Sequence, residues 1–66
     1  MKFETYGLNV AKIRIAKNIS AYELSLRLGK DPSYIHKLEN GKINVSLKTI
    51  IAISEELDVS IHDFFK

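Results

Sequence analysis

The chain of 66 residues has no cysteine, no tryptophan and a single proline. Without cysteine it can form neither a disulfide framework nor a zinc site with thiolate ligands, and we expect a cytoplasmic protein. No apolar run approaches the ~20 residues that a membrane-spanning helix needs, and no apolar segment follows the first residues as in a secretory signal. We therefore expect no membrane partner.

Groups that catalyse reactions or hold metals are also scarce. The two histidines, His36 and His62, are not at metal-ligand spacing, and no carboxylate cluster joins them. There is no Ser-His-Asp order, no phosphate-cradling glycine loop and no evident pair of carboxylates. The three glycines, Gly7, Gly29 and Gly41, fall at expected helix boundaries and are interpreted as caps. We conclude that the chain is not an enzyme and expect no metal, cofactor or small-molecule ligand.

The composition indicates one small folded domain. Hydrophobic residues make up 45% of the chain, which excludes a disordered tail, and the length allows one domain, residues 1–66, with one core. A domain this small buries only about 60% of its unfolded surface, so a partner subunit would help it. The net charge of +2 is compatible with a polyanionic partner.

The spacing of apolar residues is helical along the whole chain, and no alternation favours strands. The sequence predicts five helices: Gly7–Lys17 ended by Asn18, Ala21–Leu28 ended by Gly29, Pro32–Asn40 ended by Gly41, Leu47–Leu57 capped by Ser46, and a short helix after Ser60. The residues expected to face the core are Tyr6, Val10, Ile13, Leu24, Leu28, Ile35, Leu38, Leu47, Ile50, Ile53, Ser54, Leu57, Val59 and Phe64. Those left off the core stripes are Leu8, Ile15, Ile43, Ile51 and Phe65.

Three helix starts carry specific capping signals. One is Ser60-Ile61-His62-Asp63, which opens the short fifth helix. Ser20 and Glu23 have the spacing of a capping box, in which each side chain accepts from the other residue's N–H. Asp31 is an N-cap type, and Pro32 follows it at the first helical position, where a missing N–H costs nothing.

The second and third predicted helices form a helix-turn-helix at about residues 21–40, with the turn centred on Gly29. The small Ser25 lies where the following helix must approach closely. This arrangement presents the outer face of the helix Pro32–Asn40 to solvent, and such a helix fits the DNA major groove.

From about Tyr6 to Phe65 the sequence resembles the Cro and phage-repressor helix-turn-helix family, also called XRE-like. The stretches that carry the resemblance are Ile13-Arg14, Ile19-Ser20, Glu23-Leu24-Ser25, Leu28-Gly29, Ser33-Tyr34-Ile35, Leu38-Glu39-Asn40-Gly41-Lys42, Ser46-Leu47-Lys48-Thr49-Ile50 and Leu57-Asp58-Val59-Ser60-Ile61. The stretch Asn44-Val45-Ser46-Leu47-Lys48 also resembles small stand-alone members, including restriction–modification controllers. The resemblance implies an all-α, five-helix, lambda-repressor-like fold and a sequence-specific regulator of transcription that binds double-stranded DNA as a homodimer.

The resemblance also implies roles for individual residues. Base reading falls to Pro32, Ser33, His36 and Lys37, and phosphate contact to Ala21, Tyr22, Lys30, Tyr34, Asn40, Lys42, Asn44 and Lys48. Arg14 and Glu39 occupy the positions of a partly buried ion pair, and Ile51 and Phe65 lie near the elements through which related regulators dimerise.

Each of these roles has a plainer alternative: a solvated polar face, ordinary turn chemistry, or scattered apolar residues. Two departures from the family support a competing function, a protein-interaction module such as an antirepressor or adaptor. Ala21 stands where the family usually has a phosphate-binding Gln, and Asp31 is repelled by phosphates unless it accepts from a cytosine amine. A steep salt dependence of binding to duplex DNA would distinguish the DNA-binding regulator from the module.

Overall fold

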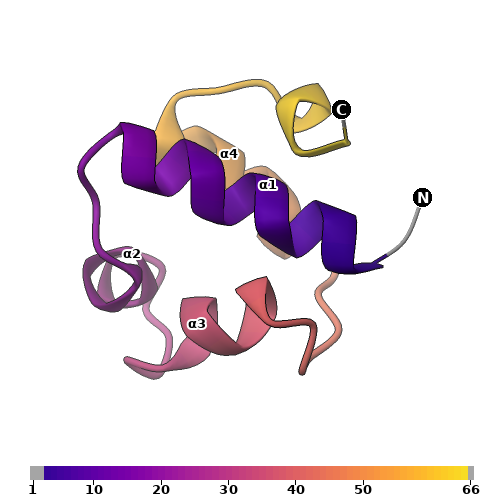
Figure 1. The fold of residues 1–66 in the computed structure, drawn as a ribbon. Coiled ribbons are helices and arrows are strands. Elements are labelled where there is room, and N and C mark those ends of the chain that lie inside the picture. Colours follow the sequence, from indigo (N-terminus) through magenta and orange to yellow (C-terminus); the bar gives the residue numbers. More distant parts are fainter. Residues whose placement is uncertain (1–2, 66) are drawn as a thin grey trace.

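The computed structural model describes the backbone of residues 3–65 and the side chains of residues 6–65. Its elements, in chain order, are α1 (Phe3–Ala16), α2 (Ala21–Arg27), α3 (Tyr34–Glu39), α4 (Leu47–Leu57) and the 3-10 helix η1 (Ile61–Phe65). The predicted all-α fold of five helices is thus confirmed, with the last helix of the 3-10 type (Figure 1). Within these residues no helix combines the length and the apolar character that crossing a bilayer requires.

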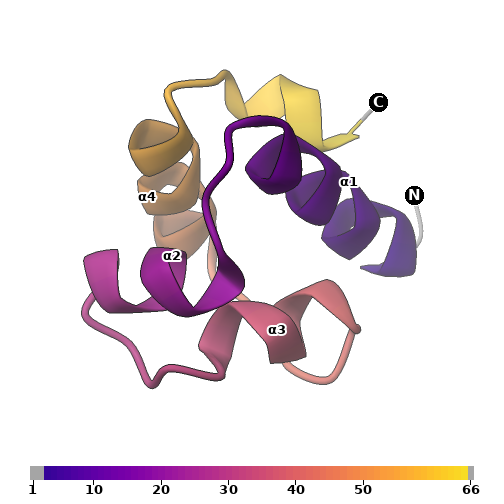
Figure 2. The same cartoon turned by 60° about the vertical axis from the view of Figure 1, so that its left-hand side comes forward.

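The helices enclose one core. α1 crosses the molecule with α4 behind it, η1 covers one side of this pair, and α2 and α3 lie on the other (Figures 1 and 2). Eight apolar side chains are buried where these elements meet: Tyr6, Val10, Leu24, Ile35, Leu38, Ile53, Leu57 and Phe64. Every helix contributes at least one of them, and burial of each such side chain stabilises the fold by about 1.5–3 kcal/mol.

Two predictions about the core are wrong. Leu47 is 63% exposed, although the helical spacing of α4 assigned it to the core stripe. Ile43, which the spacing left outside, packs against the core together with Val45. Ile43 and Val45 reach the core from the loop before α4, and a helical periodicity does not describe side chains in a loop.

All four α-helices end in the same way, on a residue with left-handed backbone: Asn18 (φ 59°), Gly29 (φ 70°), Gly41 (φ 70°) and Asp58 (φ 56°). In each case the next N–H donates back to a carbonyl of the last turn, and these N···O distances are 3.2 Å for Ile19 to Arg14, 3.0 Å for Lys30 to Ser25, 3.0 Å for Lys42 to Lys37 and 3.0 Å for Val59 to Ser54. These are Schellman motifs, which satisfy carbonyls that a helix end leaves open. The predicted stops at Asn18, Gly29 and Gly41 are confirmed, whereas the stop at Asp58 was not predicted.

The interpretation of Gly7 as a cap is wrong. α1 begins at Phe3, so Gly7 lies inside the helix. A Cβ at Gly7 would come within 2.7 Å of the Glu39 carbonyl oxygen and 2.9 Å of the Leu38 carbonyl oxygen. Glycine is therefore required here because the backbone end of α3 lies directly against α1.

The helix starts follow the predicted caps at three places. Ser20 and Ser46 accept the backbone N–H groups of Glu23 at 2.9 Å and of Thr49 at 3.3 Å. At η1 the N–H of Ser60 donates to the Asp63 carboxylate at 3.2 Å, as the capping signal predicts. The bounds of three helices differ from prediction: α1 runs over Phe3–Ala16 rather than from Gly7 to Lys17, α2 ends at Arg27, and α3 runs over Tyr34–Glu39 rather than from Pro32 to Asn40.

Candidate nucleic-acid interface

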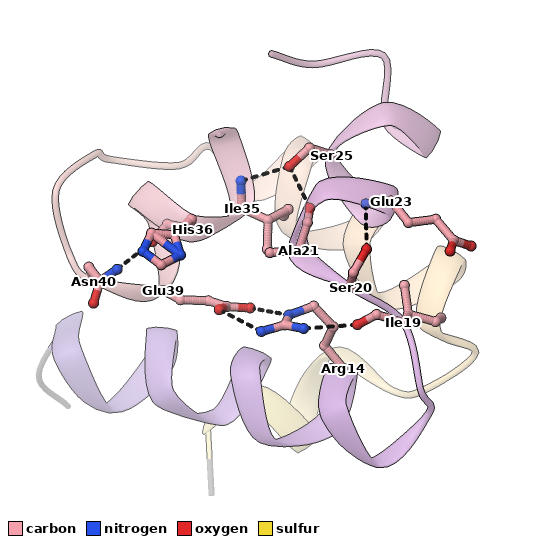
Figure 3. Close-up of polar contacts among 10 residues, drawn as sticks. All are labelled: Arg14, Ile19, Ser20, Ala21, Glu23, Ser25, Ile35, His36, Glu39 and Asn40. Carbon is pink, nitrogen blue, oxygen red and sulfur yellow. Dashed lines mark hydrogen bonds and ion pairs between the residues drawn. The ribbon is translucent and has the colours of Figure 1, made fainter. Parts of the chain in front are cut away.

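The α2–α3 pair is fastened at its centre by the buried hydroxyl of Ser25. This hydroxyl donates to the Ala21 carbonyl at 2.8 Å and accepts the Ile35 N–H at 3.0 Å (Figure 3). One side chain thus joins the middle of α2 to the first turn of α3. From the sequence, Ser25 was expected to matter only for its small size. Its polar hydroxyl beside the apolar residues Leu24 and Leu28 is the signal that could have predicted these hydrogen bonds.

A second fastening joins α3 to α1. The guanidinium of Arg14 donates through Nε to Glu39 Oε2 at 2.7 Å and through a terminal nitrogen to Oε1 at 3.1 Å. Its other terminal nitrogen donates to the Ile19 carbonyl at 2.8 Å (Figure 3). The two side chains are only 13% and 9% exposed, so the pair is largely shielded from water. The structure therefore brings together Arg14 and Glu39, which the sequence had placed on facing helices.

The start of α2 departs from the predicted capping box. Ser20 accepts the Glu23 N–H, but the Glu23 carboxylate forms an ion pair with Arg27 instead of reaching back to Ser20. Arg27 lies one turn further along the same face, where an opposite charge attracts the carboxylate. Of the two predicted phosphate contacts at this end, Tyr22 is 61% exposed and Ala21 is half-buried.

The turn before α3 explains why this helix begins late. The Asp31 carboxylate accepts both the N–H of Ser33, at 3.0 Å, and the hydroxyl of Ser33. The Tyr34 N–H donates to the Asp31 carbonyl at 2.9 Å, which closes a tight turn over Pro32. The prediction that Asp31 caps this helix is therefore wrong: Ser33 precedes α3, and the bonds of Asp31 form a separate turn ahead of the helix.

α3 has two distinct faces. Ile35 and Leu38 are fully buried, whereas His36 and Lys37 are exposed. The four predicted base-reading residues therefore all lie at the surface, Pro32 and Ser33 in the turn and the other two on the helix. A rigid helix with such an outward polar face can be presented to a groove or to another protein.

The remaining predicted phosphate contacts lie around α3. The ammonium of Lys30 stands 5.4 Å from the centre of the Tyr34 ring, which is a cation–π distance. Lys30 and Lys48 also line one hollow of about 260 Å³, together with Leu28, Thr49 and Ala52. Lysines from the α2–α3 turn and from the start of α4 therefore meet at one place.

The loop after α3 holds the other three phosphate candidates. Asn40 donates its side-chain amide to the His36 carbonyl at 2.8 Å, so it acts in the end of α3 (Figure 3). Lys42 and Asn44 follow in the loop and are exposed.

The two predicted dimer residues are both partly exposed. Ile51 on α4 is 41% exposed and Phe65 at the end of η1 is 43% exposed. The Phe65 ring lies 5.6 Å from the Tyr6 ring, so it already packs within the chain. Between residues 3 and 65, no group of three or more metal-ligating side chains gathers at one place.

Comparison with known proteins places the chain in a family. Residues 10–64 match the Helix-turn-helix family model. The structure is similar to the restriction-modification controller protein C.AhdI from Aeromonas hydrophila, with 32% identity over 96% of both chains and a TM-score of 0.89. It is also similar in fold to the hypothetical transcription factor NHTF from Neisseria, with 23% identity over 98% of this chain and 76% of that one and a TM-score of 0.89.

A further similar structure is the clp gene regulator ClgR from Corynebacterium glutamicum, with 26% identity over 94% of this chain and 66% of that one and a TM-score of 0.88. No curated protein sequence matches the chain. The family match covers most of the residues, and the resemblance to Cro and the phage repressors is confirmed. The chain belongs to the helix-turn-helix family of Cro-like transcription regulators.

Proposed function

We propose that the chain is a sequence-specific regulator that binds double-stranded DNA, with α3 and the turn before it in the major groove. The observation that carries this proposal is the division of α3 into a buried face, Ile35 and Leu38, and an exposed polar face, His36 and Lys37. An α-helix fits the major groove of B-DNA, and side chains on its outer face reach base edges there.

The fastenings around α3 support this function because reading bases requires a fixed helix. Ser25 holds the start of α3 and the Arg14–Glu39 pair holds its end. Both act from the inward side, so they leave His36 and Lys37 available to a ligand.

The lysines around α3 support the proposal that the protein also contacts the phosphate backbone of DNA. Lys30 and Lys48 share one hollow between the end of α2 and α4, and Lys42 lies in the loop beyond the end of α3. Such cations position a duplex through phosphates without reading its sequence.

We further propose that the protein acts as a homodimer. Leu47 and Ile51 lie one turn apart on α4 and are 63% and 41% exposed. An apolar pair of this kind on a small domain suits a contact with a second copy. Sedimentation at micromolar concentration tests the dimer, and a monomer both free and on DNA would contradict it.

The test of DNA reading compares Lys37→Ala with Lys42→Ala. Both variants are titrated against a duplex selected from a random pool and against a random duplex, at several salt concentrations. Lys37→Ala should weaken binding to the selected duplex by about 1–3 kcal/mol and relax the choice at one base position. Lys42→Ala should weaken binding to both duplexes alike and reduce the salt slope by about one per site.

Two outcomes count against the proposal. If Lys37→Ala binds every duplex as the wild type does, that residue does not read bases. If the wild type prefers no duplex and neither variant changes binding, the protein-interaction module becomes the better interpretation.

A further inference from the structure

Three backbone N–H groups at the start of α3 and in the turn before it are engaged within the chain. Ser33 N–H donates to the Asp31 carboxylate at 3.0 Å and Tyr34 N–H to the Asp31 carbonyl at 2.9 Å. Ile35 N–H donates to the Ser25 hydroxyl at 3.0 Å. These three N–H groups are therefore not available to a phosphate or to an acceptor on a base.

The side chains of the same turn also lack a donor for a ligand. The Ser33 hydroxyl gives its one hydrogen to the Asp31 carboxylate, so it presents only lone pairs outward. Pro32 has neither an N–H nor a polar side chain. The hydrogen bonds from the Ser33 hydroxyl and N–H hold the pKa of Asp31 below its usual range, so the carboxylate stays ionised at neutral pH.

We infer that the turn Asp31–Ser33 selects, on the DNA strand that it faces, a base with an exocyclic amine in the major groove, with cytosine favoured over adenine. The inference rests on the proposed DNA binding. The N4 amine of cytosine can donate to the Asp31 carboxylate, whereas guanine and thymine present O6, N7 or O4 acceptors that repel it. Adenine is second because its N6 amine stands beside the N7 acceptor.

Lys37, one turn further along the chain, is suited to a base edge that presents acceptors. Its N–H donates to the Ser33 carbonyl at 3.0 Å, so the two residues stand one turn apart along the same exposed side of the chain. The ammonium of Lys37 can only donate, and it suits guanine O6 and N7. An acceptor at the turn and a donor on the helix read different base pairs, so together they fix the register of the protein on the duplex.

The test compares the duplexes that the wild type and Asp31→Asn select from a random pool. The asparagine oxygen can still accept from Ser33, while its NH₂ group offers a donor to the base. The wild-type sites should carry cytosine, or less often adenine, at one position that Asp31→Asn changes to guanine or thymine. Discrimination at that position should change by about 5- to 150-fold, and the other positions should keep their bases.

A further variant isolates the effect of Asp31. Glu56→Gln removes one negative charge from an exposed residue of α4, and it should strengthen binding to all duplexes without changing the selected base. Circular dichroism establishes that each variant is helical before selection.

The outcomes separate this inference from the proposed function. If Asp31→Asn selects the same base as the wild type at every position, Asp31 does not read bases, although DNA binding stands. If an A·T pair prevails over a G·C pair at the position that responds to Asp31→Asn in the wild-type sites, cytosine is not favoured and the inference is also overturned. If the wild type enriches no sequence at all, the proposed function itself fails.

Discussion

Arg14 on α1 and Glu39 on α3 are joined by two parallel hydrogen bonds, of 2.7 and 3.1 Å, between guanidinium and carboxylate. The bond from Arg14 to the Ile19 carbonyl adds the chain between α1 and α2 to the same contact. Three segments that are separate in sequence therefore share one cation.

Removal of this cation should be costly. We expect Arg14→Ala to lower the free energy of unfolding by about 3 kcal/mol or more, because Glu39 would be left shielded from water without its partner. Urea denaturation measures this loss, and a change within about 0.5 kcal/mol would show that the pair behaves as an exposed one.

A matched control is Arg27→Ala. Arg27 pairs with Glu23 across one turn of α2, but the two side chains are 41% and 49% exposed. The same substitution there should change the unfolding free energy by no more than about 0.5 kcal/mol, because water screens the pair.

Ser25→Ala should destabilise the protein by about 1–3 kcal/mol, because the buried N–H of Ile35 would lose its acceptor. Amide hydrogen exchange at Ile35 should accelerate by more than at Leu38, which lies in the same helix but does not depend on this hydroxyl. Equal acceleration at the two amides would mean that Ser25 stabilises the whole core and does not fasten the start of α3.

Gly7 and Gly29 should both resist alanine, for different reasons. At Gly7 a methyl group would meet the backbone of α3 at 2.7 Å. The resulting overpacking, about 1–3 kcal/mol, should exceed the ~1 kcal/mol gained from the better helix propensity of alanine. At Gly29 nothing lies within 4 Å, but φ is +70°, which costs an L residue about 1–2 kcal/mol.

Asparagine distinguishes the two causes. Gly29→Asn should cost less than Gly29→Ala, because asparagine tolerates left-handed backbone. Gly7→Asn should cost more than Gly7→Ala, because its side chain is larger. Thermal denaturation of the four variants would contradict this account if asparagine ranked the same way against alanine at both positions.

The stability of the protein should fall at alkaline pH through Tyr6. Burial, with a smaller effect from Tyr34, raises the pKa of Tyr6 from 10.0 to about 12. In the unfolded chain the phenol ionises near pH 10, so ionisation favours unfolding above that pH until the folded protein ionises as well. The contribution of Tyr6 is therefore complete below about pH 10 and is lost between about pH 10 and 12.

Comparison with Tyr6→Phe isolates this contribution from the other tyrosines and the lysines. The decline in unfolding free energy between pH 10 and 12 should be shallower for the variant than for the wild type. Parallel curves for the two proteins would mean that Tyr6 ionises in the folded state as readily as in the unfolded state.

The helix ends were predictable from sequence because their causes are local. Asn18, Gly29 and Gly41 tolerate left-handed backbone, and Ser20 and Ser46 can accept an N–H of the next turn, whatever the rest of the chain does. Gly7 was misinterpreted because the reason for a glycine there lies 31 and 32 residues further on, in the carbonyls of Leu38 and Glu39. Ile43 was misplaced because helical periodicity takes no account of a loop residue that packs against the core.

In the candidate site, too, only some of the features could be predicted from the sequence. The exposed side of α3 followed from helical spacing, which places His36 and Lys37 opposite the core. The late start of α3 did not follow from the sequence. The residues Asp31-Pro32-Ser33 are compatible both with a first helical turn and with a separate closed turn. The choice depends on hydrogen bonds between Asp31 and Ser33 that composition alone does not specify.

In the short helix α3, the residues that hold the helix in place differ from the residues that face solvent. Ile35, Leu38 and Glu39 hold it to the rest of the molecule, and His36 and Lys37 take no part in those contacts. Exposed substitutions of this kind usually change stability by no more than about 0.5 kcal/mol. Substitutions at positions 36 and 37 therefore alter the surface that the proposed DNA contact uses, while the fold stays intact.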